Sequence, residues 1–396
     1  MSQQTRDYFF KHQAQTNGNP IGLEIKRAKG SYIYDKNNKK YLDLVAGVSA
    51  CTLGHCHPKV VRAVKKQMRK YLHVMVYGEF IQDEPARLTQ LLAKHLPNKL
   101  SCTYLTNSGT EAIEGALKLA KRATGRHQII AAHNAYHGST QGALSVMGYE
   151  KRKRAYRPLI PGTSFIHFND FEDIQKIGKN TAAVILETIQ GGAGFITPVD
   201  GYLHAVRKRC NQVGALLIVD EIQPGMGRTG KLFAFQHYNL VPDILVTGKG
   251  LGGGFPVGAF CASKDLMQLL QEKPILGHIT TFGGHPVIAA ACHATLQVVV
   301  KGDLMAKTVR KEQLIRDYLK HSAIKEIRGK GLMLALILDS PTIARQLAKR
   351  ALQEGVLLFF LLFESKALRI TPPLTISERE LKKGCKKILN ILDEIC

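Results

Sequence analysis

The residues best able to do chemistry in this 396-residue chain are two carboxylates and a lysine, placed at the ends of apolar runs. The run ALLIV (215–219) ends on Asp220 and Glu221, and the run DILVTG (243–248) ends on Lys249. Both runs have the length of a buried strand. A lysine among glycines and apolar residues is partly desolvated, and desolvation lowers the pKa of an amine. Lys249 is therefore a candidate to form a Schiff base with an aldehyde.

A carboxylate and a reactive lysine that end consecutive strands suit the chemistry of pyridoxal 5'-phosphate (PLP). An acid beside the pyridine nitrogen keeps the ring protonated, so that the ring can act as an electron sink. Taken alone, each residue has an ordinary explanation, because an aspartate at a strand end often caps a turn and a lysine among glycines is often solvated. The order of Asp220 and Lys249, and the residues around them, favour PLP chemistry.

The segments VDEIQPGMGRTGK (219–231) and PDILVTGKGLGGGFPVGA (242–259) resemble class III (ornithine/acetylornithine-type) aminotransferases, which are PLP enzymes of fold type I. The resemblance extends roughly over residues 19–394. It implies an α/β fold in which a large domain has a mostly parallel central sheet flanked by helices, with a smaller α+β domain beside it. The predicted limits are an N-terminal segment of the small domain (1–55), the large PLP-binding domain (56–298) and the C-terminal small domain (299–396).

The resemblance also implies which residues bind the cofactor. Lys249 would bind it covalently, Asp220 would partner the ring nitrogen, and Gln223 would contact the ring hydroxyl. Tyr136 and Ile222 would lie on the two faces of the ring. The expected cofactor-binding residues are Ser108, Gly109, Thr110, Tyr136, His137, Glu187, Asp220, Ile222, Gln223, Lys249 and Thr281.

The cofactor phosphate is expected at the start of the helix predicted from Ser108, in SGTEAIEGALK. Free backbone N–H groups and the helix dipole both attract a phosphate, which makes Gly109 and Thr110 candidate contacts. The alternative is an ordinary helix cap, in which Glu111 completes a capping box with Ser108. By resemblance, Thr281 reaches the phosphate of the neighbouring subunit, which implies a homodimer with two shared sites.

Three substrate-binding positions follow from the resemblance, namely Arg369, Val48 and Ser139, and a fourth position, Gly192, lies beside them. Arg369 matches the arginine that binds a substrate carboxylate, and Val48 matches a wall of the substrate pocket. Ser139 stands where many ornithine and acetylornithine enzymes have a second arginine, and a serine cannot offer a bidentate clamp. Gly192 stands where several relatives have a glutamate that covers the first arginine.

The predicted activity is ping-pong transamination between two small molecules, an amino donor and a keto acid. The first candidates are an (acetyl)ornithine-like ω-amino donor and 2-oxoglutarate. The departures at Val48, Ser139 and Gly192 leave open another ω-amine, such as 4-aminobutyrate or lysine, and also pyruvate as the acceptor. A PLP-binding protein without catalytic activity is a more distant alternative, which the presence of Lys249, Asp220 and Gln223 disfavours.

The formal net charge of +24 raises the question of an acidic macromolecular partner. The basic residues are dispersed, and their densest cluster, KRKRAYR (151–157), is short and has no nucleic-acid motif beside it. We therefore expect no nucleic-acid partner. No apolar run reaches membrane-spanning length, and the N-terminus lacks the apolar core of a secretory signal. We expect a cytoplasmic protein with no membrane partner.

Eight cysteines are scattered through the chain, and we expect them to be reduced. Cys51, His55, Cys56 and His57 lie close together in the sequence. Their spacing fits no standard zinc site and no second pair of ligands follows, so we predict no metal.

Overall fold

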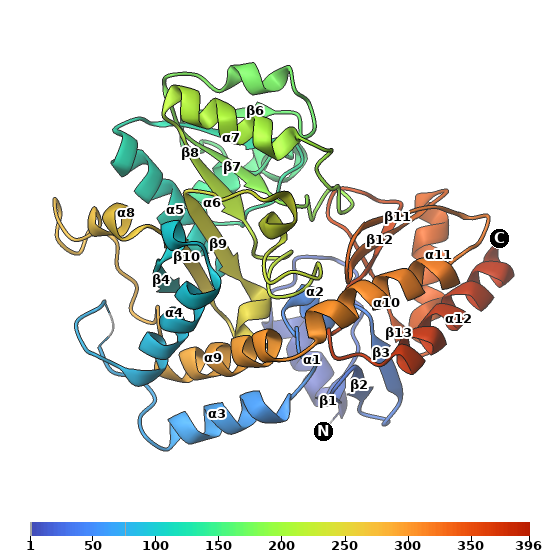
Figure 1. Ribbon diagram of the computed structural model, residues 1–396. Coiled ribbons are helices and arrows are strands. Elements are labelled where there is room, and N and C mark those ends of the chain that lie inside the picture. Colours follow the sequence, from blue (N-terminus) through green and yellow to red (C-terminus); the bar gives the residue numbers. More distant parts are fainter. Residues whose placement is uncertain (1, 76) are drawn as a thin grey trace.

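The computed structural model describes residues 2–75 and 77–396, and its centre is a seven-stranded sheet (Figure 1). In order across the sheet the strands are β4 (Cys102–Thr106), β10 (Gly258–Ala262), β9 (Ile244–Gly248), β8 (Leu216–Asp220), β7 (Thr181–Glu187), β5 (Gln128–Ala132) and β6 (Thr163–Ile166). β10 is antiparallel to both of its neighbours, whereas the other neighbouring strands run parallel. The predicted mostly parallel central sheet is confirmed.

Helices cover both faces of this sheet, which explains why its inner strands β7, β8, β9 and β10 are almost entirely buried. Along β8, Leu217 and Val219 join the core on one face, and Ile218 joins the core on the other. The helices packed on the first face are α3 (Pro58–Met68), α4 (Asp83–His95), α7 (Tyr202–Val213) and α9 (Pro286–Lys301). Those on the opposite face are α5 (Gly109–Thr124), α6 (Gln141–Ser145) and α8 (Lys264–Gln268).

A smaller unit combines both ends of the chain. Its first sheet has the order β1 (Ile25–Lys29), β2 (Tyr32–Asp35), β3 (Lys40–Asp43) and β13 (Val356–Leu357). Its second sheet has the order β11 (Ile324–Lys330), β12 (Met333–Leu338), β15 (Ala367–Ile370) and β14 (Phe359–Phe360). The helices α10 (Leu304–Tyr318), α11 (Pro341–Gln353) and α12 (Glu378–Ile395) pack with them, and Leu42 and Leu44 belong to the same core. The domain limits themselves stay a prediction.

The segment VLLFFLLF (356–363), which the sequence analysis interprets as one buried strand, forms two short strands instead. β13 pairs with β3 in one sheet, and β14 pairs with β15 in the other. Because the segment passes from one sheet to another, it bends and leaves Phe359 43% exposed. This bend determines one wall of the site described below.

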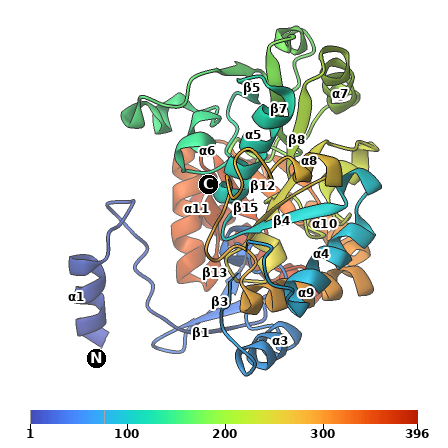
Figure 2. The same ribbon diagram turned by 90° about the vertical axis from the view of Figure 1, so that its left-hand side faces the viewer.

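The first helix lies at the periphery of the molecule. α1 (Ser2–His12), which was not predicted from the sequence, stands apart from the rest of the chain (Figure 2).

Within the described residues, no single helix has the length and hydropathy to cross a membrane. α9 and α10 meet that test only as a pair, bent by 71° where they join.

Candidate active site

A cavity of about 450 Å³ opens at the carboxyl ends of β7, β8 and β9, the edge at which open α/β sheets bind ligands. It brings together residues from segments far apart in the sequence. The lining residues are Val48, Gly109, Thr110, Tyr136, His137, Gly138, Ser139, Glu187, Gly191, Gly192, Asp220, Ile222, Gln223, Pro224, Lys249, Phe359, Leu362 and Arg369. Of the site residues predicted from the sequence, only Ser108 and Thr281 lie outside this lining.

Lys249 directly follows β9 and begins a short 3-10 turn. Its φ of 36° lies in the left-handed region, which is uncommon for a residue with a side chain. Burial lowers the pKa of the Lys249 amine, whereas the carboxylates of Asp220 and Glu187 act in the opposite direction. The cavity therefore holds an amine that loses its proton more readily than an ordinary lysine, which is the condition for nucleophilic attack.

Asp220 is the last residue of β8, and both of its carboxylate oxygens are engaged. Oδ2 lies 2.8 Å from Nδ1 of His137, and Oδ1 accepts a hydrogen bond from the N–H of Ile222 at 2.9 Å. Both side chains are almost completely buried, and Nε2 of His137 has no partner. The pair holds the Asp220 carboxylate at a defined place in the cavity.

Glu221, the second carboxylate of the opening motif, points away from the cavity. Its Oε1 accepts from the Thr188 hydroxyl at 2.5 Å, and its two oxygens also accept from the N–H groups of Ala234 and Phe235. Burial raises the pKa of the Glu221 carboxyl to about 7. Glu221 is the first residue after β8, so Asp220 at the strand end lines the cavity, whereas Glu221 hydrogen-bonds to the chain that follows it.

We expect Glu221 to make the free energy of unfolding fall as the pH rises from about 4.5 to 7. In that window the folded chain keeps a proton that the unfolded chain has released. Each pH unit therefore lowers the free energy of unfolding by about 1.4 kcal/mol, and the decrease over the whole window is about 3 kcal/mol. The uncharged variant Glu221→Gln should have a flatter dependence between pH 5 and 7. Urea titrations across this range measure it, with the exposed Glu150→Gln as control. Equal slopes for wild type and Glu221→Gln would contradict the prediction.

The start of α5 presents free backbone N–H groups to the cavity through Gly109 and Thr110. Ser108 is the N-cap, and its hydroxyl accepts from the N–H of Glu111 at 3.3 Å. Glu111 accepts a hydrogen bond from the N–H of Asn107 rather than from that of Ser108, so the reciprocal capping box of the alternative interpretation does not form. A Cβ at Gly109 would lie 2.7 Å from Cδ1 of Ile222, so only glycine permits this close packing.

Glu187 positions the two loops beside Asp220. Its oxygens accept from the N–H groups of Tyr136 at 3.1 Å and of Gly191 at 2.8 Å. Burial raises the pKa of the Glu187 carboxyl to about 7. Gln223 lines the same region and lies 3.4 Å from the hydroxyl of Ser49. These contacts hold the loops at Tyr136 and Gly191 in place around the amine of Lys249 and the carboxylate of Asp220.

Arg369 projects from β15 into the opposite side of the cavity. Its Nε and Nη2 donate to the carbonyl oxygen of Phe360 at 3.2 and 2.9 Å, whereas Nη1 is buried and has no partner. Burial lowers the pKa of the Arg369 guanidinium to about 10, so it stays charged at neutral pH. Ser139, at the mouth of the cavity, lies 3.3 Å from the hydroxyl of Tyr136. The free Nη1 is therefore a hydrogen-bond donor for an anionic ligand.

Phe359, Leu362 and Phe363 were not among the site residues predicted from the sequence. Phe359 and Leu362 line the cavity. Phe363 stacks on Tyr149 at 4.3 Å and occupies the space above Gly192, where an added Cβ would lie 2.7 Å from its ring. The run of large apolar residues in 356–363 could have indicated an apolar wall of the cavity, but such a run is equally typical of a buried strand. Only the break between β13 and β14 distinguishes these two interpretations.

Val48 belongs to α2 (Ala46–Ser49) and lies in the wall of the cavity. Its φ of 58° is unusual for a β-branched residue. Asp43 supports the turn, because its Oδ1 accepts from the N–H groups of Val45 and Ala46 at 2.8 and 2.9 Å. Oδ2 of Asp43 lies 2.8 Å from Nε2 of His55, so part of the Cys51–His57 cluster supports this turn.

Thr281 is exposed and lies outside the cavity of its own chain. Its hydroxyl lies 3.4 Å from that of Tyr77. Sequence reasoning placed it at a neighbouring subunit's cofactor, and that placement stays a prediction.

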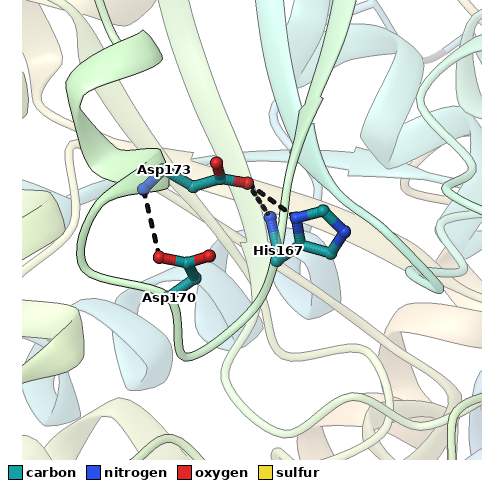
Figure 3. A group of neighbouring side chains, drawn as sticks. All are labelled: His167, Asp170 and Asp173. Atoms are coloured by element: carbon teal, nitrogen blue, oxygen red, sulfur yellow. Dashed lines mark hydrogen bonds and ion pairs between the residues drawn. The ribbon is translucent and has the colours of Figure 1, made fainter.

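A cluster outside the lining of the cavity has a spacing that would suit a metal ion, and consists of His167, Asp170 and Asp173 (Figure 3). Oδ2 of Asp173 accepts from the backbone N–H of His167 at 2.7 Å and lies 2.8 Å from its Nδ1. Oδ1 of Asp170 accepts from the N–H of Asp173 at 3.2 Å. These bonds close the turn after β6, which accounts for the cluster.

Comparisons with known proteins identify the family of the chain. The family model for aminotransferase class-III matches residues 13–392. Acetylornithine aminotransferase of Bacillus subtilis is 39% identical over 373 residues, covering 92% of this chain and 94% of the relative. Putrescine aminotransferase of Pectobacterium atrosepticum is 38% identical over 403 residues, covering 96% of this chain and 84% of the relative.

Solved structures agree as well. The crystal structure of ornithine aminotransferase from Toxoplasma gondii superposes with a TM-score of 0.92 at 30% identity, covering all of this chain and 96% of that one. A second crystal of that enzyme has PLP at partial occupancy in its active site. The resemblance inferred from the sequence is confirmed, and the chain belongs to the class III aminotransferases, which are PLP-dependent enzymes of fold type I.

Proposed function

We propose that this aminotransferase moves an amino group from an ω-amino donor to a keto acid, in two half-reactions at the cavity described above. The observation that carries the proposal is that Lys249, Asp220 and Arg369 line one cavity. These three side chains supply a nucleophilic amine, a buried carboxylate and a carboxylate-binding cation.

The residues present fit PLP. An amine of lowered pKa suits its aldehyde, and the carboxylate of Asp220 suits a protonated ring nitrogen. The N–H groups at Gly109 and Thr110 suit its phosphate, since they begin a 16-residue helix. Bound there, PLP supplies the electron sink that stabilises a substrate carbanion.

The chain's own side chains then have distinct tasks. Nζ of Lys249, as a neutral amine, would take the proton from the amino-bearing carbon of the donor and release it to the cofactor within the same half-reaction. In the second half-reaction it would carry a proton the opposite way, to the carbonyl-derived carbon of the keto acid. His137 holds the Asp220 carboxylate, and Glu187 holds the loops that carry Tyr136 and Gly191. Further contacts proposed for the ring come from Tyr136, Ile222 and Gln223.

Arg369 is proposed to bind the carboxylate of the keto acid. Arg369→Ala should raise the KM for 2-oxoglutarate at least about tenfold, the effect of losing a charged hydrogen bond. Cofactor retention should not change, since Arg369 bonds to Phe360 rather than to the residues around Asp220. Steady-state kinetics measure the KM for 2-oxoglutarate. We expect the KM of Arg369→Lys to lie between that of the wild type and that of Arg369→Ala. An unchanged KM would mean that another group binds the carboxylate.

The first candidate donor is an acetylornithine-like amine, and the first candidate acceptor is 2-oxoglutarate. The similarity to acetylornithine aminotransferases supports this choice. A second candidate is a different ω-amine with pyruvate as acceptor. It is favoured by the single arginine in the lining and by the apolar residues Val48, Phe359 and Leu362 around it.

A half-reaction screen tests the function. The PLP-loaded enzyme is mixed separately with N-acetylornithine, ornithine, 4-aminobutyrate, lysine, glutamate and alanine, and the absorbance of the bound cofactor is followed. Fast conversion by acetylornithine and glutamate supports the first candidate, whereas conversion by another ω-amine with acetylornithine inert supports the second. No change with any donor would refute amino transfer and favour the catalytically inactive PLP-binding protein.

We also propose that the enzyme is a homodimer in which Thr281 serves the neighbouring site. Thr281 is flanked by exposed apolar side chains, including Phe282, Ile279 and Ile275. Phe282→Asp should weaken self-association at least about tenfold, as loss of a buried aromatic anchor does, and should lower turnover in parallel. Sedimentation velocity measures this, with the exposed Tyr156→Asp as control. A wild-type monomer with full turnover would disprove the shared site.

A further inference from the structure

Two apolar residues of the smaller unit, Phe359 and Leu362, form a wall of the cavity, here called the substrate wall. They are 43% and 36% exposed. Phe359 lies in the two-residue strand β14, and Leu362 lies beyond the end of that strand. Asp220 and Lys249, in contrast, lie at the ends of strands of the central sheet. The position of the substrate wall relative to these two residues therefore depends on contacts between the two units.

Phe363 makes such a contact, although it does not line the cavity itself. Its N–H donates to the carbonyl oxygen of Gly192 at 2.9 Å, and a Cβ added at Gly192 would lie 2.7 Å from Cε2 of the Phe363 ring. Gly192 follows Gly191, whose N–H donates to Glu187 at 2.8 Å. Glu187 is the strand neighbour of Asp220. Phe363 thus connects the substrate wall to the loop beside the buried carboxylates.

The residue on the other side of Leu362 contacts the same loop. Leu361 is buried in an apolar cluster that includes Ile189 and Phe195. Both of these residues belong to the loop that follows β7 (188–196). The chain is therefore fastened to this loop at Leu361 and at Phe363, and Leu362 between them lines the cavity.

Tyr149 and Arg152 also contact the Phe363 ring. The rings of Tyr149 and Phe363 stack with their centroids 4.3 Å apart and their planes at 18°. Cζ of Arg152 lies 5.9 Å from the Phe363 centroid, within the range of a cation–π contact, and its Nη2 donates to the carbonyl oxygen of Leu362 at 3.3 Å. Arg152 belongs to the basic cluster KRKRAYR (151–157), so at least this member of the cluster supports the substrate wall.

From these contacts we propose that Phe363 is a positioning residue: by packing against Gly192 and Tyr149, it holds the substrate wall where the hydrocarbon chain of the amino donor packs. This inference rests on the proposed function and names the part of the donor that the wall recognises. Phe359 and Leu362 carry no charge, so they contribute to binding by removing apolar surface of the donor from water. Loss of this contact should raise the KM for the donor and leave kcat nearly unchanged.

Phe363→Ala in the PLP-loaded enzyme tests the proposal. We expect the KM for N-acetylornithine to rise about tenfold, the upper value for the loss of an aromatic pair, while kcat changes by less than about twofold. If N-acetylornithine is inert, the donor converted fastest in the half-reaction screen takes its place. An unchanged KM, or a loss confined to kcat, would overturn the proposal.

Variants of Tyr149 show whether Phe363 acts through the aromatic stack. Tyr149→Ala should raise the KM for the same donor about as much as Phe363→Ala does, whereas Tyr149→Phe keeps the ring and should restore the wild-type KM. Phe171→Ala, which removes an exposed ring elsewhere in the chain, is the control. A wild-type KM in Tyr149→Ala would contradict the role of the stack.

Gly192→Ala provides a further test, because its effect should depend on Phe363. The added Cβ has to displace the Phe363 ring, so we expect the KM to rise at least about fivefold. In the Phe363→Ala background there is no ring to displace, and the double variant should match Phe363→Ala within about twofold, because effects of residues in contact do not add. Effects that multiply in the double variant would show that the two residues act separately.

Hydrogen exchange provides a readout that does not need turnover. The N–H of Phe363 is bonded to Gly192, so its exchange rate reports whether the substrate wall is fastened. In PLP-loaded Tyr149→Ala, we expect this amide to exchange about tenfold faster than in the wild type, as measured by mass spectrometry of peptides that span 359–364. If no donor is converted while exchange is faster, the proposed transamination fails and the positioning role stands. If donors are converted while neither exchange nor KM changes, the inference itself fails.

Discussion

Replacing Lys249 by alanine is expected to lower turnover by at least about 10⁴-fold, the upper range of what a positioned proton-transferring group contributes. The variant loses both the nucleophile and the only lysine in the lining of the cavity. It should also lose the absorbance that comes from covalent attachment of the cofactor, which a spectrum of the purified protein measures. The two losses have one cause, so they should occur together.

Lys249→Arg separates the charge of this residue from its chemistry, since a guanidinium stays protonated and does not attack an aldehyde. We expect it to be as inactive as the alanine variant. Lys264→Ala, at the exposed start of α8, is the matched control and should keep full activity. Near-normal turnover in either Lys249 variant would sink the assignment.

Replacing Asp220 by asparagine is expected to lower kcat by about 10²- to 10³-fold, the loss seen when one electrostatic group is removed from a buried site. The amide has nearly the same size and can still bond to Nδ1 of His137 and to the N–H of Ile222, so the fold should be retained. What is lost is the negative charge that we propose keeps the cofactor ring protonated. Single-turnover kinetics with a good donor measure the effect on the chemical step.

Two controls make the Asp220 result specific. Asp220→Glu keeps the charge but moves it, and should retain more activity than Asp220→Asn. Asp265→Asn, in the exposed first turn of α8, should have no effect. If Asp220→Asn matched wild type in single-turnover rate, the carboxylate would have no role in the chemistry.

Asp220 and Lys249 could be predicted because each ends an apolar run of strand length. Strands of this kind pair in parallel, and their carboxyl ends meet at one edge of the sheet. Residues that end two such runs are therefore close in space, even before the strand order is known. The helix at Gly109 followed in the same way from the N-cap at Ser108, whose hydroxyl does accept from the first turn.

The orientation of the Glu221 side chain, unlike the positions of Asp220 and Lys249, could not be predicted from the sequence. Its neighbour Asp220 lines the cavity, whereas Glu221 binds Thr188 and the N–H groups of Ala234 and Phe235. A carboxylate can serve either purpose, and the choice depends on how the chain turns after β8, which ends at Asp220. That turn is set by packing against segments that are not adjacent in the sequence.

The sequence by itself determined the family, the parallel sheet and the chemical groups at the carboxyl ends of its neighbouring strands. These features depend on local apolar runs and on short motifs. Only the tertiary structure decided the substrate wall. Phe363 reaches Gly192 across more than a third of the chain, and Nη1 of Arg369 is without a partner while its other two nitrogens donate to the carbonyl oxygen of Phe360. Such contacts join segments distant in the sequence, and their geometry arises only when both domains are folded.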